Sequence, residues 1–212
     1  MSGRKYAISR RRLRVLVTLS LLFISALLAA DRYFLDSEVS SHSVEVDRPI
    51  GDYQRYNGKS FVVTNVVDGD TFDIEVPDGN SRLTRIRLWG VDTPETKSKA
   101  SPDYFGPQAT QFTKEKTLNK KVTVYLDDEK TRCYYGRLLA YVKLADGTFL
   151  NEELISEGFA YADLRYRHDY YIKYQQLESI ARSEREGLWE NVTRNQLPEW
   201  LQKNKPNLLK KK

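Results

Sequence analysis

Short segments in which apolar and polar residues alternate dominate the middle of this 212-residue chain. Alternation of this kind puts every second side chain on one face of an extended strand, so each segment predicts a half-buried β-strand. Turn-forming residues at 77–80 and 146–147 separate neighbouring segments. Alternation predicts strands over residues 71–76 and 82–89, and a β-branched run predicts one over residues 61–67. Two more strands are predicted over residues 121–126 and 137–144, which gives five.

Helical patterns lie between and after these strands. Helices are predicted over residues 108–118, 150–157 and 170–185. Gly158, directly after the second of them, is typical of the left-handed residue that ends a helix. The order of strands, helix, strands and helices is typical of a mainly β fold with α, a five-stranded OB-like barrel packed against about three helices.

The most apolar stretch lies near the N-terminus. Residues 15–30 are uncharged and follow a basic region at residues 1–14. Because positive charge stays on the cytoplasmic side, this pattern predicts an extracytoplasmic domain. The stretch at 15–35 is a transmembrane anchor, formed by an N-terminal hydrophobic helix, or a signal peptide that is cleaved to release the protein. Its uncharged run is shorter than the roughly 20 residues of a spanning helix, and it lacks an A-x-A cleavage triplet, so both readings stay open.

The remaining chain divides by composition. Residues 36–58 are polar without sustained periodicity, which indicates a linker. A folded domain is predicted at 59–192, followed by a Lys-rich tail at 193–212. We expect this tail to be a solvated basic end with weak affinity for polyanions, or to be disordered.

The charge distribution limits how a polyanion could bind. The whole chain carries 34 basic and 29 acidic residues, but residues 59–193 carry 19 basic and 22 acidic ones. Bulk positive charge is therefore absent from the predicted domain, and any polyanion site must be local. Cys133 is the only cysteine, which excludes an intrachain disulfide and a thiolate zinc site. With two histidines in the chain, a bound metal is expected to be a hard cation on carboxylates.

Two clusters of charged residues are candidates for chemistry. Asp68 and Asp70 flank a glycine between two predicted strands, which alone is a weak signal because Asp-Gly turns are common in hairpins. Arg87, Asp92 and Glu95 lie close together where the third strand runs into a loop.

Strand periodicity adds an expectation about Arg87. On a regular strand Arg87 shares a face with Trp89 and Val91, so it is expected to point towards the barrel side. A charge there is costly unless it is paired, which favours a site with the nearby carboxylates. The alternative is an exposed arginine beside ordinary loop acids.

Residues 67–71, 87–96 and 135–137 resemble the three signature blocks of the staphylococcal nuclease (thermonuclease) family, in the same order and with similar spacing. The resemblance extends over about residues 61–189. It implies an SNase-like OB-fold domain with the activity of a Ca2+-dependent phosphodiesterase. Such an endonuclease cleaves DNA and RNA with little sequence specificity and leaves 3′-phosphate products. We expect a monomer whose substrates are DNA and RNA, with a membrane contact through the N-terminal segment if that segment is uncleaved.

The resemblance also implies roles for individual residues. Asp70, Asp92 and the backbone carbonyl of Thr93 would bind Ca2+, with Asp68 just outside this shell. Glu95 would act as general base or orient it, Arg87 and Arg137 would bind the phosphate, and Tyr135 and Tyr166 would stack on bases.

The chain departs from the family pattern at positions that concern binding. Tyr134 stands where the staphylococcal enzyme has a phosphate-binding lysine, and Leu164 stands where it has the first of two stacking tyrosines. The alternative function is therefore a catalytically inactive module of the same fold that binds nucleic acid or protein.

Overall fold

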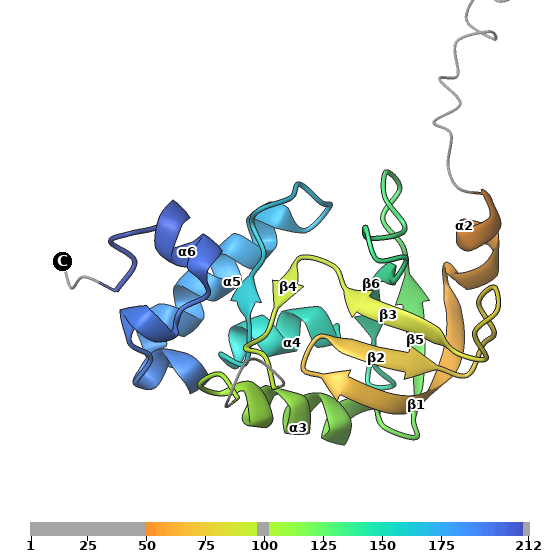
Figure 1. Cartoon of the computed structure of the whole chain (residues 1–212), viewed down its shortest axis with the longest axis horizontal. Coiled ribbons are helices and arrows are strands. Elements are labelled where there is room, and N and C mark those ends of the chain that lie inside the picture. Colours follow the sequence, from red (N-terminus) through yellow and green to blue (C-terminus); the bar gives the residue numbers. More distant parts are fainter. Residues whose placement is uncertain (1–49, 97–101, 210–212) are drawn as a thin grey trace, which may run out of the picture. The chain divides into compact units, whose positions relative to one another are not determined.

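The computed structural model describes residues 50–96 and 102–209, within a compact unit that spans Asp47–Lys212 (Figure 1). The predicted anchor or signal peptide lies outside these residues, as does most of the predicted linker. In the part of the chain that is described, no helix combines the length and the apolar character needed to cross a membrane.

A closed five-stranded barrel is the central element, as the alternating patterns predict. Its strands are β1 Lys59–Asp68, β2 Thr71–Ile74, β3 Thr84–Leu88, β5 Lys121–Tyr125 and β6 Leu138–Lys143. They follow the order β1-β2-β3-β6-β5 around the barrel, and β5 closes it by pairing with β1. All pairs are antiparallel except β3 and β6, which run parallel. The prediction of an OB-like barrel is therefore confirmed.

Apolar side chains at alternate positions fill the barrel. In β3, Ile86 and Leu88 are almost completely buried, whereas Arg85, which lies between buried Thr84 and Ile86 in the strand, is exposed. Two register shifts between β1 and β2 mark bulges, and bulges bend a strand and increase its twist, as closure requires. A second sheet of two strands, β4 Val91–Asp92 and β7 Tyr161–Ala162, extends beyond the barrel. The sequence gives no separate signal for it.

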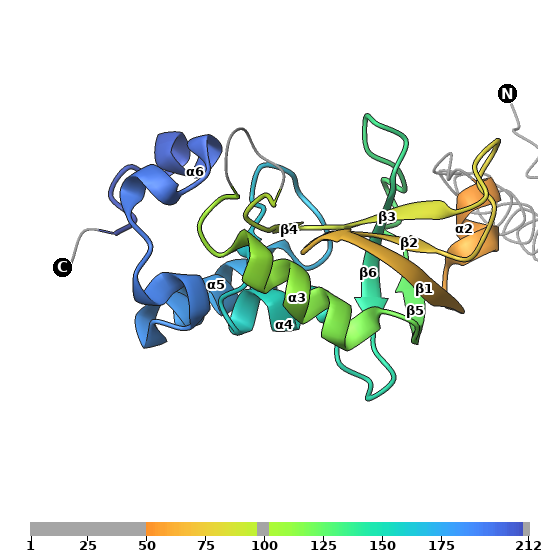
Figure 2. The same cartoon turned by 60° about the horizontal axis from the view of Figure 1, so that its bottom comes forward.

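Helices cover the barrel on one side and continue beyond it (Figures 1 and 2). The three predicted helices are present as α3 Gly106–Thr117, α4 Leu150–Ser156 and α5 Tyr171–Glu184. Gly158 has the left-handed backbone expected after α4. Short elements follow α5, namely η1 Gly187–Glu190, η2 Arg194–Gln196 and α6 Glu199–Asn204.

The predicted linker at 36–58 extends too far, because α2 Ile50–Tyr56 belongs to the folded domain. Tyr56 is fully buried in the main core, and its hydroxyl lies 3.0 Å from Thr84 Oγ1. Arg132 pairs with Asp52 of α2 at 2.7 Å. Aromatic packing and an ion pair thus hold a helix that is too short to show hydrophobic periodicity.

The predicted Lys-rich tail also contains structure. Leu197 and Leu201 are buried in a second apolar cluster with Tyr161, Leu188 and Trp189. Residues 193–209 therefore pack on the domain, and the expectation of a solvated or disordered end is corrected for them. The physical reason is that the basic segment also carries apolar side chains, Leu197 in the extended stretch before α6 and Trp200 and Leu201 within it, and all three pack on the same cluster.

Candidate active site

Arg87 pairs with two carboxylates that lie far apart in the sequence, Asp70 and Asp92. Its Nη1 contacts Asp70 Oδ1, and its Nη2 donates to Asp92 Oδ1 at 2.8 Å. Asp70 lies in the turn between β1 and β2, whereas Asp92 lies in β4. The structure thus brings together three residues of two separate sequence blocks. Their side chains are between 2% and 17% exposed, so little water screens these contacts.

The expectation that Arg87 faces the barrel interior is wrong. The core face of β3 is formed by Ile86 and Leu88, and Arg87 projects to the opposite face, where it lines a surface cavity with Trp89. Its side chain is nevertheless largely buried, because Asp70 and Asp92 cover it. Pairing with carboxylates, not placement in the core, therefore explains the burial of this charge.

Asp70 is fixed by the residues around its turn. Its Oδ2 accepts hydrogen bonds from the backbone N–H and the hydroxyl of Thr93, at 2.8 and 3.0 Å. A side chain at Gly69 would come within 2.7 Å of Thr93, so only glycine permits this approach. Thr113 of α3 donates to the Gly69 carbonyl at 2.5 Å. These contacts explain why a glycine separates Asp68 from Asp70.

Asp92 contacts two further residues, Trp200 and Arg165, that the sequence did not indicate as part of the site. Trp200 of α6 donates its indole N–H to Asp92 Oδ2 at 2.8 Å. Arg165 lies on the other side, with Nη2 3.4 Å from Asp92 Oδ1, and pairs with Asp163 at 2.7 Å. Trp200 and Arg165 were not among the predicted site residues. The helical spacing around Trp200 could have indicated a packed helix, but not this hydrogen bond.

Glu95 and Asp68 both interact electrostatically with Arg87. The side chain of Glu95 is exposed, but desolvation by neighbouring protein groups and the charge of Asp68 raise its pKa, while Arg87 opposes the rise. Burial also raises the pKa of Asp68, against the charges of Arg87 and Arg137. The loop of Glu95 is fixed by a backbone hydrogen bond of 2.8 Å from Asp103 to the Glu95 carbonyl. Desolvation and a neighbouring carboxylate thus both disfavour the charged form of Glu95.

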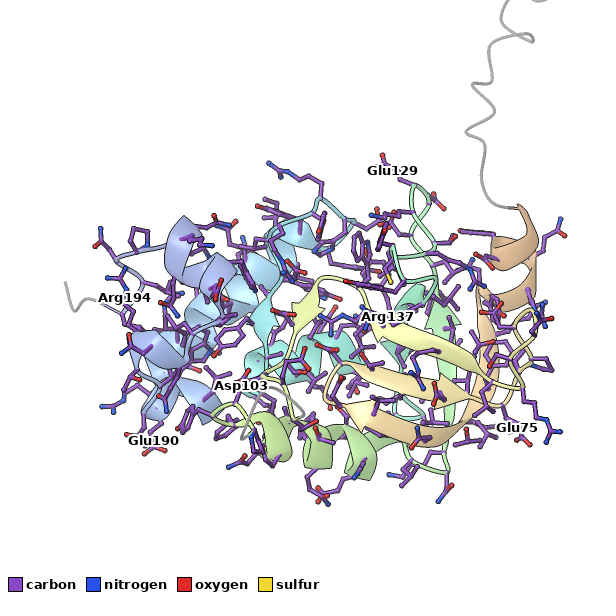
Figure 3. All side chains as sticks on the ribbon, viewed as in Figure 1. Glu75, Asp103, Glu129, Arg137, Glu190 and Arg194 are labelled. Atoms are coloured by element: carbon purple, nitrogen blue, oxygen red, sulfur yellow. The ribbon has the colours of Figure 1, made fainter. Side chains whose placement is uncertain are left out.

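Arg137 directly precedes β6 and lines the same cavity as Arg87. This cavity has a volume of about 350 Å³. Arg137 is placed beside β3 because β6 pairs in parallel with it, with Leu139 opposite Arg87. Its guanidinium lies 5.6 Å from the centroid of the Tyr135 ring, and its Nε lies 3.4 Å from Cys133 Sγ. Figure 3 shows Arg137 near the middle of the molecule and Glu129 at the tip of an outer loop.

Exposed aromatic rings border the cavity. Tyr135 is 79% exposed, and Tyr166 is 52% exposed and stacks on Trp89 at 6.0 Å between ring centroids. Lys130 Nζ lies 5.2 Å from the Tyr166 ring centroid. Trp89 and Lys130 were not predicted as site residues. Leu164, in contrast, packs against the main core.

The candidate cation ligands are carboxylates and a backbone carbonyl. Within residues 50–96 and 102–209, no group of three or more His, Cys, Asp or Glu side chains is arranged to hold a metal ion. The predicted set contains two carboxylates and a carbonyl, and its carboxylates, Asp70 and Asp92, converge on one cationic group, Arg87. Two hard oxygen donors that already share a positive charge fit a hard cation such as Ca2+.

Comparison with known proteins identifies the family. Residues 85–191 match the family model described as staphylococcal nuclease homologue. A thermonuclease of Staphylococcus intermedius is 40% identical over 135 residues, 63% of this chain and 77% of that protein. A thermonuclease of Staphylococcus hyicus is 39% identical over 141 residues, with coverages of 66% and 78%. A protein of Escherichia coli named an uncharacterized endonuclease is 34% identical over 140 residues, with coverages of 66% and 81%. The chain therefore belongs to the staphylococcal nuclease family.

Proposed function

We propose that this protein is a Ca2+-dependent endonuclease that hydrolyses phosphodiester bonds of DNA and RNA with little sequence specificity. The observation that carries the proposal is Arg87, which bridges Asp70 and Asp92 and lines one cavity with Arg137. Family membership supports it, since relatives are named thermonuclease and endonuclease.

Arg87 and Arg137 are proposed to bind the scissile phosphate. Their planar guanidinium groups match the geometry of phosphate oxygens and stabilise the negative charge that grows on them during attack. Arg87 is already paired with Asp70 and Asp92, so binding a phosphate requires it to exchange carboxylate partners for phosphate oxygens. A cation bound by the two aspartates would favour this exchange.

Asp70, Asp92 and the carbonyl of Thr93 are proposed to hold that Ca2+. When bound, the ion supplies positive charge beside the phosphate and leaves fewer uncompensated carboxylates in the cluster. Asp68 would stand behind these ligands, because its Oδ1 accepts from the backbone N–H of Asp70 at 3.2 Å.

Glu95 is proposed to act as the general base. It would take a proton from the water that attacks phosphorus, or orient that water, as the bond to the 5′ oxygen breaks. The new bond joins the water oxygen to phosphorus, and the departing oxygen gains a proton. The products are a 3′-phosphate and a 5′-hydroxyl.

Aromatic stacking would account for low sequence specificity. Tyr135 and the stacked pair of Tyr166 and Trp89 present ring faces beside the cavity. Every base has a face that can stack, so such contacts bind single strands without reading their sequence. Lys130, above the stacked pair, would add attraction for the backbone.

The test is cleavage of end-labelled DNA and RNA by the purified protein. We expect cleavage in Ca2+, loss of activity with EGTA, and recovery when Ca2+ is returned in excess. DNA products should resist extension by a polymerase until a phosphatase removes the 3′-phosphate. Full activity in EGTA would exclude the calcium requirement. Binding without cleavage in Ca2+ would instead favour the alternative function, an inactive binding module.

We also propose that the domain acts outside the cytoplasm, because a basic region precedes the apolar residues 15–30. Protease treatment of intact cells should remove the domain if it is anchored on the outer side. Mass spectrometry of the mature N-terminus would distinguish the anchored form from the cleaved one.

A further inference from the structure

The two aspartates of the centre are held in equivalent ways by different parts of the chain. Each directs Oδ1 towards Arg87 and is hydrogen-bonded through Oδ2 on its outer side. For Asp70 the outer partner is Thr93, through its N–H and hydroxyl. For Asp92 the outer partner is the indole N–H of Trp200, 108 residues further along the chain.

The indole of Trp200 is itself fixed in place. Its neighbours Leu197 and Leu201 are buried in the second apolar cluster, which also contacts the Trp200 ring. The Arg165 guanidinium lies 4.8 Å from the centroid of that ring. Lys205, one turn further on, pairs at 3.2 Å with the buried Glu178 of α5. The indole N–H that donates to Asp92 thus belongs to a side chain whose helix, α6, is packed against the rest of the domain.

We propose that Trp200 is a positioning residue for the cation site. By occupying Oδ2 of Asp92, it prevents the carboxylate from turning and keeps Oδ1 directed at the centre that Asp70 also faces. This inference rests on the proposed function, because it assumes that Asp92 binds a cation. Partners that orient metal-binding carboxylates typically contribute 10-fold to 100-fold in metal affinity.

The chain offers a matched control. Trp189 belongs to the same apolar cluster, yet its indole N–H is buried without a hydrogen-bond partner among the described residues. Trp189→Phe and Trp200→Phe therefore make the same chemical change in the same cluster. Only Trp200→Phe removes a hydrogen bond to Asp92.

The experiment measures Ca2+ binding to the full-length protein by calorimetry, for wild type, W200F, W189F and D92N. We expect the Kd for Ca2+ to rise by roughly 10-fold to 100-fold in W200F and to stay within about twofold of wild type in W189F. Thermal unfolding in EGTA should be similar for the two phenylalanine variants. Trp200→His, which keeps a ring N–H, should recover part of the affinity.

Two outcomes would overturn the inference, and they are distinguishable. Equal Ca2+ affinity in W200F and wild type would exclude the positioning role and leave the calcium site intact. Absence of Asp92-dependent binding in the wild type would overturn the calcium site and the positioning role with it. If W200F loses its fold, W200H decides between the same outcomes, since only a positioning role requires the ring N–H.

Discussion

The barrel edge, meaning the cluster of Arg87, Asp70 and Asp92 beside the barrel, and the C-terminal segment at 193–209 contribute to one candidate site by different physical means. At the barrel edge, charged side chains from separate sequence blocks pair directly, as Arg87 does with Asp70 and Asp92. The C-terminal segment carries mostly apolar contacts, through Leu197 and Leu201, and reaches the charged centre by one hydrogen bond from Trp200.

This difference separates the residues proposed to carry out chemistry from the residues proposed to keep them in place. Substitution at the barrel edge is expected to remove activity while leaving the fold intact. Substitution in the C-terminal segment is expected to act on stability first, and on the site only through Trp200. The two regions can therefore be distinguished by measuring activity and unfolding on the same variants.

The largest effect is expected for Glu95→Gln. Loss of a general base lowers the rate by about 10² to 10⁴, and the amide cannot accept the proton of the attacking water. The rate of DNA cleavage at saturating Ca2+ checks this. Glu75→Gln is the matched control, because Glu75 is exposed and lies at an outer edge of the molecule (Figure 3).

Both variants should unfold within roughly 0.5 kcal/mol of wild type, as substitutions at exposed positions do. A normal rate in Glu95→Gln would remove the base from the mechanism. A comparable loss of rate in Glu75→Gln would show that the assay reports general damage and not chemistry.

A pair of leucine substitutions compares the two regions directly. Leu154 of α4 and Leu201 of α6 are both fully buried, one in the main core and one in the second cluster. Removing a buried leucine side chain typically costs about 2–5 kcal/mol. We expect Leu154→Ala to fall within this range, and Leu201→Ala near its lower end, because a short terminal helix can open locally.

Urea unfolding followed by circular dichroism measures both values. Leu201→Ala should in addition weaken Ca2+ binding, since it loosens the helix that carries Trp200, whereas Leu154→Ala should not. A Leu201→Ala variant as stable as wild type would show that the C-terminal segment is not part of the cooperative fold.

The fold could be predicted from sequence because its main signals are periodic. Alternation over residues 71–76 and 82–89 follows from side chains that point to opposite faces of a strand, whatever lies around them. The same reasoning failed for Arg87, whose burial depends on paired carboxylates and not on the strand face. Each strand of the two-stranded sheet, β4 and β7, has only two residues, which are too few to show a periodic pattern.

The charged residues of the site could be proposed from local motifs, but their supporting partners could not. The hydrogen bond from Trp200 to Asp92 joins residues 108 positions apart and depends on the whole path of the chain between them. Helix α6 has six residues, and helices of this length are marginal without tertiary packing. Basic residues around it, such as Lys203 and Lys205, instead favoured a solvated or disordered tail.

The smallest effects are expected when Lys203 or Lys205 of this segment is substituted. Comparing the two substitutions distinguishes a structural role of these lysines from a purely electrostatic one. Lys205 pairs at 3.2 Å with Glu178, which is 1% exposed. Lys203 pairs at 3.7 Å with Glu199, and both side chains are more than three quarters exposed. Lys205→Met should lower stability by roughly 1 kcal/mol, because Glu178 loses one of two cationic partners and keeps Arg182.

Lys203→Met should cost less than about 0.5 kcal/mol, since exposed ion pairs are screened by water and salt. Both substitutions remove one positive charge, so a loss of nucleic-acid affinity common to both would indicate a charge effect. A loss confined to Lys205→Met, together with lower stability, would show that this lysine acts by holding α6 against α5. Equal stability of the two variants would instead mean that the apolar cluster alone keeps Trp200 beside Asp92.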